Sequence, residues 1–334
     1  MSGLVTIFGG SGFLGRYIAR RMAQQGWRVR VATRRPNDAM FVRTYGVVGQ
    51  VEPIFCNIRD DASVQAALTG ATAVVNCVGI LAEKGKNGFD AVQVDGAERV
   101  ARLAKENGVA RMVQVSAIGA DAESDSDYSR TKAEGEAAVL AHMPDAMILR
   151  PSILFGAEDE FFNRFATMTK FGPVLPMVGA STRFQPVYVD DVAAAAEQGV
   201  LGTAPGGIYE LGGPDVSTFR ELMQEMLGVI HRRRILLNLP VPIARLMAFG
   251  LNVVQFVSFG LIHNNTLTGD QITNLQKDNV VSGDHKGFDD LGITPVATEA
   301  VLPDYLWRFR PSGQFDAIKD SAKNLRVLSW LNME

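Results

Sequence analysis

The chain opens with a short apolar segment, Leu4–Phe8, that runs directly into a turn with glycines at positions 9, 12 and 15. This order predicts a strand, a tight turn and a helix. A helix that begins in this way directs unpaired backbone N–H groups and the positive end of its dipole at the turn, where a pyrophosphate binds. A second β-type run, Arg28–Thr33, follows one helix length later and completes a βαβ unit. The sequence therefore predicts a dinucleotide-binding turn, with a plain structural turn as the alternative.

The three glycines have different expected roles. Gly9 allows the tight turn, Gly12 lets the backbone approach the phosphates, and Gly15 lets the helix pack on the strand. We expect the turn to bind the nucleotide through Gly9, Ser11, Gly12, Phe13 and Leu14.

The end of the second predicted strand indicates which nucleotide binds. About 20 residues past the glycines an NAD-binding unit would place a carboxylate for the ribose hydroxyl. This chain has Arg34 and Arg35 there instead. Two guanidinium groups suit a 2′-phosphate, because they bind it through paired charge-assisted hydrogen bonds. We therefore predict NADPH, with a solvated basic surface turn as the alternative for the same residues.

Apolar strands alternate with helical patterns through the first half of the chain. This alternation predicts a doubly wound α/β Rossmann fold, in which ligands bind beyond the carboxyl ends of parallel strands. The predicted strands are Leu4–Phe8, Arg28–Thr33, Val51–Phe55, Ala73–Val78, Arg111–Ser116 and Ala146–Pro151. The residues expected at their ends, and so in the nucleotide site, are Asn57, Ile58, Cys77, Val78, Gly79, Ser116 and Pro151.

After Gly156 the alternation fails, and segments with proline and glycine predict a smaller, discontinuous second lobe. The chain is expected to return to the sheet near Pro186–Ala193 and Ile208–Leu211. The predicted division is a nucleotide domain of residues 1–156 with 185–212, a second lobe of residues 157–184 with 213–315, and a tail of residues 316–334.

Composition excludes several classes of protein. A chain of 334 residues with 47% hydrophobic and 21% charged residues can bury a large core, which excludes wholesale disorder. The net charge of −3 and the lack of any zinc-type spacing disfavour nucleic acid as a partner and predict no metal site. Cys56 and Cys77 fall in or beside predicted buried strands, so we expect reduced thiols and a reducing compartment.

A second set of residues has the spacing of a proton-transfer site. Ser116 ends a predicted strand, and Tyr128 and Lys132 follow four residues apart on one face of a predicted helix. A nearby ammonium favours the phenolate, so the pair could exchange a proton with an alcohol or carbonyl that Ser116 orients. Lys132 could also hold the ribose hydroxyls. An ordinary helix face is the alternative for the pair.

Together with the glycine turn, these residues resemble the short-chain dehydrogenase/reductase family, in its extended or atypical branch. Nearly the whole chain takes part, because Asn76–Gly79 and Leu149–Gly156 are similar to the family's fourth-strand and sixth-strand motifs, and segments 187–193 and 209–214 match as well. One residue departs from the pattern. Gln93 stands where active members usually carry the asparagine of a proton relay, although its amide can still form hydrogen bonds.

The second half of the chain resembles one subgroup, the nucleotide-binding accessory subunits of respiratory complex I, the NADH:quinone oxidoreductase. The motifs that carry this resemblance are segments 267–271, 278–284, 288–293 and 302–311. It implies a tightly held NADPH with a structural role, at the junction of the peripheral and membrane arms near the quinone site. It also implies other complex I subunits as partners and a peripheral place on the inner membrane, on the matrix side in a mitochondrion or the cytoplasmic side in a bacterium.

Two other functions fit the same residues. The intact Ser116, Tyr128 and Lys132 set fits a free NADP-dependent reductase or epimerase whose substrate binds between the lobes. A soluble redox-sensing module that binds its nucleotide reversibly is the third hypothesis.

The densest basic cluster, His231–Arg234, precedes a long apolar segment, Pro242–His263. Polar residues recur along this segment at near-helical spacing, which predicts a helix with one narrow polar stripe and a wide apolar face. We expect this helix to lie in the membrane interface or on a partner, with the basic cluster near anionic head groups. A membrane span and a place in the core of the second lobe are the alternatives.

Overall fold

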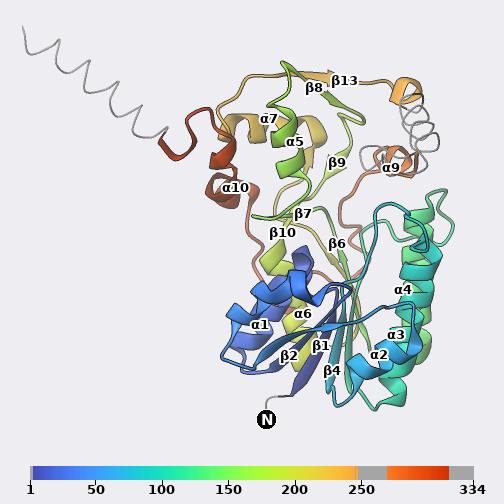
Figure 1. The fold of residues 1–334 in the computed structure, drawn as a ribbon. Helices are drawn as coiled ribbons and strands as arrows, with labels where there is room; N and C mark the ends of the chain where they lie inside the picture. The colour runs from blue at the N-terminus through green and yellow to red at the C-terminus, as the bar shows by residue number, and fades with distance from the viewer. Residues whose placement is uncertain (1–2, 245, 247–268, 316–334) are drawn as a thin grey trace, which may run out of the picture.

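The structure, a computed structural model, describes residues 3–244, 246 and 269–315. A parallel sheet of seven strands lies at the centre of its larger part (Figure 1), in the order β11-β6-β5-β4-β1-β2-β3. The strands are β1 (Leu4–Phe8), β2 (Arg28–Thr33), β3 (Val51–Phe55), β4 (Ala73–Asn76), β5 (Arg111–Val115), β6 (Met147–Pro151) and β11 (Gly207–Leu211). The predicted doubly wound α/β fold is confirmed.

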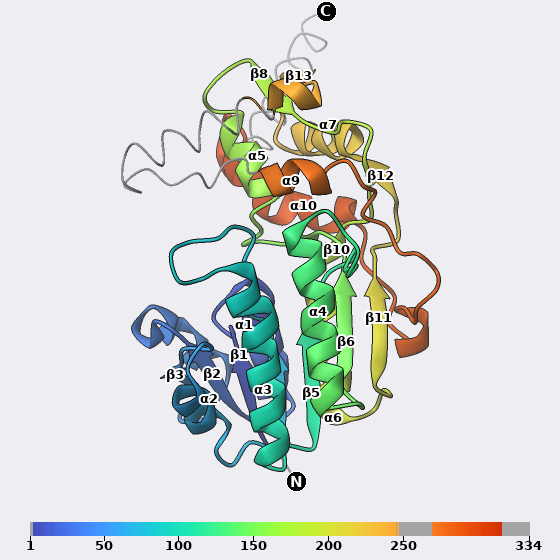
Figure 2. The same cartoon turned by 90° about the vertical axis from the view of Figure 1, so that its right-hand side faces the viewer.

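Two layers of helices cover this sheet. One face carries α1 (Phe13–Gln24) and α6 (Val189–Leu201), and the other carries α2 (Asp61–Leu68), α3 (Asp95–Glu106) and α4 (Asp127–His142). On the second face α3 and α4 run side by side (Figure 2). Both faces of the sheet are therefore buried, as a parallel sheet requires.

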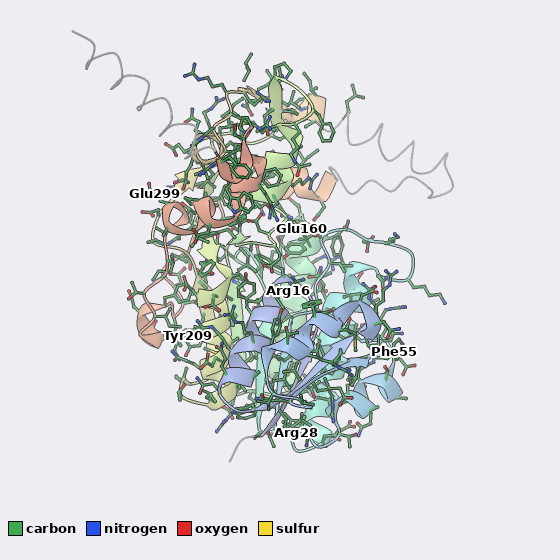
Figure 3. The ribbon with its side chains drawn as sticks, turned by 60° about the vertical axis from the view of Figure 1, so that its left-hand side comes forward. Arg16, Arg28, Phe55, Glu160, Tyr209 and Glu299 are labelled. Atoms are coloured by element: carbon green, nitrogen blue, oxygen red, sulfur yellow. The ribbon has the colours of Figure 1, made fainter. Side chains whose placement is uncertain are left out.

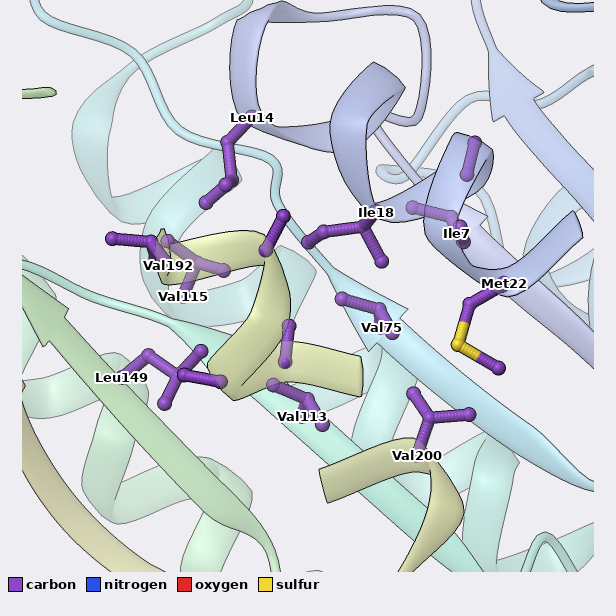
Figure 4. Close-up of a cluster of buried hydrophobic side chains, with 14 of the residues drawn as sticks. Ile7, Leu14, Ile18, Met22, Val75, Val113, Val115, Leu149, Val192 and Val200 are labelled. Atoms are coloured by element: carbon purple, nitrogen blue, oxygen red, sulfur yellow. The ribbon is translucent and has the colours of Figure 1, made fainter. Parts of the chain in front are cut away.

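The core between the sheet and the first helix layer fixes the position of α1. Figure 4 shows Ile18 and Met22 of α1 and Val192 of α6 beside Val75 and Val113 of the sheet. All five side chains are fully buried. Because the stripe of α1 that carries Ile18 and Met22 is held on the sheet, the N-terminus of α1 is held next to the carboxyl end of β1.

The predicted strands differ from the observed ones mainly at their ends. Those predicted over Ala73–Val78 and Arg111–Ser116 end sooner, at Asn76 and Val115. The Asn76 side chain accepts a hydrogen bond from the Val78 backbone N–H at 3.1 Å, which turns the chain away from the ladder. The segment Pro186–Ala193 adds no strand to the central sheet. It forms β10 (Val187–Tyr188), which pairs with β7 (Leu154–Phe155), and then the start of α6.

The second lobe has a separate core rich in aromatic and methionine side chains, among them Phe162, Phe219 and Met226. Its elements are α5 (Phe162–Met168), β8 (Val174–Met177), β9 (Arg183–Phe184), β12 (Ser217–Thr218), α7 (Phe219–Val229), β13 (Ile235–Asn238), α9 (Gly269–Asn274) and α10 (Thr298–Leu306). Shorter helical segments of the chain are η1 (Pro36–Tyr45), η2 (Asp90–Val94), η3 (Asp289–Leu291), η4 (Trp307–Phe309) and η5 (Gly313–Phe315).

One part of the predicted second lobe packs elsewhere. Phe288 and Leu291 are buried in the same cluster as α1 and α6, and the Glu210 backbone N–H donates to the carbonyl of Lys286 at 2.8 Å. The chain thus returns to the nucleotide domain before it forms α10. The division into residues 157–184 with 213–315 stays a prediction.

Most of the predicted interfacial segment Pro242–His263 and the whole tail 316–334 lie outside the described residues. Within the described part of the chain, no helix has the length and apolar character needed to cross a bilayer.

Candidate functional site

The glycine turn has the backbone geometry that phosphate binding requires. Gly9 has a φ of 73°, and its N–H donates to the carbonyl of Ala32 at 3.0 Å. A Cβ on Gly15 would collide with the carbonyl oxygen of Gly9 and lie 2.6 Å from the Cα of Gly10. The turn therefore depends on glycine at both positions, because one needs a left-handed backbone and the other allows α1 to approach the turn.

The first turn of α1 is open to an anion. Gly12 is the N-cap residue, so no side chain caps the helix, and the first turn contains no acidic residue. The backbone N–H groups that begin the helix, around Phe13 and Leu14, keep the partial positive charge of a helix N-terminus. The residues present therefore fit a pyrophosphate.

The end of β2 lies beside this turn. Ser11 Oγ donates to Thr33 Oγ1 at 3.1 Å, which joins the turn to the residue before Arg34. Arg34 and Arg35 are both exposed. The Arg35 guanidinium lies 3.8 Å from the Asp38 carboxylate with 83% of its side chain exposed, so this ion pair is weak. Both guanidinium groups are available for a phosphate on the adenosine ribose.

The remaining predicted residues follow one rim of the sheet, at the carboxyl ends of its strands. Asn57 and Ile58 follow β3, whereas Pro151 ends β6. Five strand spacings of about 4.8 Å separate β3 from β6, so the rim is about 24 Å long. The structure therefore does not gather all predicted residues at one point but arranges them in a line.

Ile58 differs from its neighbours in this line. Its side chain is only 9% exposed and packs in the core beneath α2 and α3. A nucleotide can therefore contact Ile58 only through its backbone or through the small exposed part of its side chain.

The middle of the rim brings three polar side chains together. Ser116 follows β5, and Lys132 of α4 donates from Nζ to the carbonyl of Val115 at 3.4 Å. Lys132 Nζ lies 5.8 Å from the centre of the Tyr128 ring. A Cβ on Gly79 would lie 3.1 Å from Lys132 Nζ, so the glycine after β4 makes room for the ammonium.

Two buried atoms at this place lack partners. The Oγ of Ser116 and the Oε1 of Gln93 have no hydrogen-bond partner among the described residues, although their side chains are only 4% and 3% exposed. Orphaned buried polar atoms are costly and commonly mark a site that binds a ligand or water.

The family comparison agrees with this geometry. Residues 5–212 match the family model described as the NAD dependent epimerase/dehydratase family. The chain belongs to this family.

Relatives of this family member cover both of its lobes. It is 38% identical over 320 residues to the mitochondrial NADH dehydrogenase [ubiquinone] 1 alpha subcomplex subunit 9 of Arabidopsis thaliana, a match that covers 94% of this chain and 80% of the relative. It is 30% identical to the NADH-ubiquinone oxidoreductase 40 kDa subunit of Neurospora crassa, over 96% and 83% of the two chains.

An enzyme and a solved structure are also similar to this family member. The ceramide reductase of Caulobacter vibrioides is 33% identical over 72% of this chain and 74% of the reductase. The structure of the Bordetella bronchiseptica enzyme WbmG in complex with NAD superposes with a TM-score of 0.69 at 15% identity, over 92% of this chain and 94% of that one. At this identity the likeness concerns the fold alone.

Protonation at the Tyr128 pair differs from the expectation drawn from the sequence. Burial lowers the pKa of Lys132 to about 8, against the raising effect of Glu136. Burial, with a smaller contribution from the negative charge of Asp270, raises the pKa of Tyr128 to about 12. The sequence predicts that Lys132 lowers the pKa of Tyr128. In the structure desolvation is the largest effect on this group, and the pKa is raised instead.

Asp270 is the residue that sequence reasoning missed. It lies in α9, and its carboxylate accepts hydrogen bonds from Ser126 Oγ at 3.1 Å and the Asp127 N–H at 2.9 Å. In the sequence, segment 267–271 contains this residue and stands out only as a motif of the second half. Nothing local in the sequence could place it against a helix that begins more than a hundred residues earlier.

The sequence also gave no sign of the irregular helix around Gln93. This residue lies in η2, a π-helical turn, and its Nε2 donates to the carbonyl of Ile80 at 3.2 Å. The backbone of α4 at Gly135 packs directly on the carbonyl of Gln93. Such π-turns are common at functional sites, and this one packs against α4, the helix that carries Lys132.

Proposed function

We propose that this chain is an accessory subunit of respiratory complex I that holds NADPH as a structural group. The observation that carries the proposal is the similarity to two complex I subunits, from a plant and a fungus, over more than nine tenths of this chain. Because that similarity includes the second lobe, it goes beyond what a shared nucleotide-binding domain would give.

The choice of NADPH rests on the end of β2. Arg34 and Arg35 are exposed next to the phosphate-binding turn, and no carboxylate follows β2 where the ribose hydroxyl of NAD would need one. The glycine turn, these two arginines and Lys132 would hold the nucleotide. When bound, NADPH supplies hydride-transfer chemistry.

A structural role for the nucleotide is supported by Gln93, which stands where active members of the family usually carry the asparagine of a proton relay. The pKa of Tyr128, raised to about 12, also makes its phenolate scarce at neutral pH, so the residue is a weak general base for alcohol oxidation. A ligand that binds only the folded state stabilises that state by mass action, whether or not it reacts. The nucleotide can therefore hold the chain in its folded form without turnover.

The proposed location rests on the resemblance of the second half of the chain to accessory subunits of complex I. Other complex I subunits would be the partners, and the chain would sit at the junction of the peripheral and membrane arms, near the quinone site. Its place would be peripheral on the inner membrane, on the matrix side in a mitochondrion or on the cytoplasmic side in a bacterium.

Purification of the tagged full chain from solubilised native membranes tests the proposal. We expect other complex I subunits and NADH:quinone oxidoreductase activity to copurify, with NADPH released on denaturation. Tyr128→Phe should leave quinone reduction unchanged. A chain that never accompanies the complex would refute the subunit role, and release of NADH would refute the nucleotide assignment.

A free NADP-dependent reductase is the second candidate. It is favoured by the placement of Ser116, Tyr128 and Lys132 around the ends of β4 and β5, and by the similarity to a protein named ceramide reductase. In that case Tyr128→Phe should abolish NADPH oxidation while NADPH binding persists. An unchanged rate in this variant would exclude the mechanism.

A further inference from the structure

The end of the second lobe farthest from the N-terminus carries an amphipathic strip. Figure 1 places β8 and β13 at this end. Along the segment that enters and forms β13, alternate side chains are exposed, namely His231, Arg233, Ile235 and Leu237. We call these four residues the amphipathic strip. Its outward face changes from basic to apolar within seven residues.

The arginines of this segment are divided between two tasks. The Arg232 guanidinium donates to the carbonyl of Phe309 at 2.8 Å, and that of Arg234 donates twice to the carbonyl of Thr169. These two arginines hold the segment on the lobe. Arg233 makes no ion pair or side-chain hydrogen bond among the described residues, and it points outward with the strip. The basic cluster predicted from the sequence is therefore only partly available to a partner.

Apolar side chains extend the strip on its apolar side. Ile235 is 65% exposed and Leu237 47% exposed, and the register partner of Ile235 in β8, Val174, is 40% exposed. Phe171, just before β8, is 85% exposed. A single exposed apolar side chain is normal on a protein surface. A contiguous group of them is unusual and marks an interaction surface.

The charge of the surrounding chain indicates what covers this surface. Two long segments of sequence, 161–189 and 226–269, contain no Asp or Glu in a protein that has 36 acidic residues. Both β8 and β13 lie within them. Residues 247–268 therefore cannot supply a countercharge to Arg233. An open hollow of about 550 Å³ beside the end of α7, lined by His231–Arg234, leaves space for an anionic group.

We propose that the amphipathic strip docks on a bilayer that contains anionic phospholipid, with Arg233 at the level of the phosphates and Ile235 and Leu237 at the acyl boundary. This deepens the proposed function, on which it rests, by naming the surface of the second lobe that meets the membrane. Along one face of the strip, a basic side chain is followed by apolar side chains. This order matches the change from charged head groups to acyl chains in a bilayer.

Flotation of the purified full chain with vesicles tests this proposal. The vesicles are phosphatidylcholine alone or phosphatidylcholine with phosphatidylglycerol. We expect Arg233→Gln to weaken binding to the anionic vesicles roughly fivefold and to leave the weak binding to neutral vesicles unchanged. The double variant Ile235→Thr/Leu237→Thr places β-branched threonines, which suit a strand, in β13 and should weaken binding to both vesicles by about tenfold or more.

The nucleotide domain offers matched control variants. Arg28 is exposed at the end of that domain opposite to the second lobe (Figure 3), so Arg28→Gln removes the same charge elsewhere. Val47 and Val48 are 73% and 104% exposed, so Val47→Thr/Val48→Thr removes two exposed apolar side chains. Both controls should bind vesicles like the unchanged protein. Bound NADPH, measured in every preparation, reports that the variants fold.

Equal binding to neutral and anionic vesicles would overturn the inference, and so would strip variants that bind vesicles like the controls. If such variants bind vesicles normally but no longer copurify with complex I, the surface is a protein interface. A chain that holds NADPH and copurifies with complex I but ignores vesicles would refute this inference alone. Loss of copurification in the unchanged protein would refute the proposed function instead.

Discussion

The carboxylate of Asp270 in α9 accepts a hydrogen bond from the backbone N–H of Asp127, at 2.9 Å, in the first turn of α4. A second bond, from Ser126 Oγ, fixes the other carboxylate oxygen. The second lobe thereby places a negative charge against the helix turn that carries Tyr128. An anion at a helix N-terminus is favourable, so the contact stabilises α4 while it disfavours the phenolate of Tyr128.

Asp270→Asn should therefore lower the pKa of Tyr128 from about 12, because the variant removes the negative charge but does not change the desolvation of the half-buried ring. Burial is the larger cause of the shift, so the pKa should stay above the ordinary value of 10.0. Phenolate absorbance measured during a pH titration, minus that of the Asp270→Asn/Tyr128→Phe variant, isolates this one tyrosine. Asp304→Asn, at an exposed position of α10, should leave the pKa of Tyr128 unchanged. If both variants behave alike, the contact has no electrostatic effect on the tyrosine.

Arg34→Ala or Arg35→Ala should each weaken NADPH binding roughly tenfold. A hydrogen bond to a charged group contributes about 1.5–3 kcal/mol, and a hydrogen bond at an exposed site lies at the low end of this range. NADH binding should change little, because NADH lacks the 2′-phosphate. Isothermal titration of nucleotide-free protein with both nucleotides measures the difference. Arg28→Ala, a change of the same type at the start of β2, is the control. Equal losses for NADPH and NADH would show that the arginines do not read the 2′-phosphate.

Gly15→Ala should destabilise the protein by about 1–3 kcal/mol and abolish nucleotide binding, because the added Cβ meets rigid backbone atoms of the turn at Gly9 and Gly10. Gly228→Ala is the matched control, since this glycine also lies in a helix but an added Cβ would meet nothing within 4 Å. That change should raise stability by about 0.5–1 kcal/mol through helix propensity. Urea unfolding of both variants compares them. A tolerated Gly15→Ala would contradict the close approach of α1 to the turn.

The buried ammonium of Lys132 should make stability depend on pH in nucleotide-free protein. Its pKa is about 8 in the folded chain and 10.5 when unperturbed, so the unfolded state binds more protons between these values and stability rises with pH across this window. Between about pH 7.5 and 9.5 the gain from this group should be about 2 kcal/mol.

Urea unfolding at the two pH values measures this gain, which Lys132→Met should remove. Lys86→Met, at an exposed lysine, should retain the dependence of the unchanged protein. An identical pH profile for Lys132→Met and the unchanged protein would mean that Lys132 is not desolvated.

Several features were predictable because they depend on neighbours in the sequence. The bounds predicted for β1, β2 and β3 are those observed, since alternation of apolar residues and the glycines that stop it act within a few positions. The open start of α1 and the exposure of Arg34 and Arg35 follow from the same local pattern. The predicted end of β4, Val78, lies two residues beyond the observed end at Asn76, because the Asn76 side chain accepts a hydrogen bond from the Val78 N–H in competition with the ladder.

The Rossmann sheet, the glycine turn and the residue types along the rim can be read from the order of residues, because backbone conformation and hydrophobic periodicity are local properties. The contact of Asp270 with the start of α4 and the return of Phe288 to the first core cannot, since they depend on packing between distant segments. The same holds for the inward direction of Arg232 and Arg234 and the exposure of Arg233. The protonation of Tyr128 and the surface offered to a membrane depend on burial and on charges brought together from distant parts of the chain. Desolvation and Coulomb interactions act through space, and so the order of residues alone does not fix them.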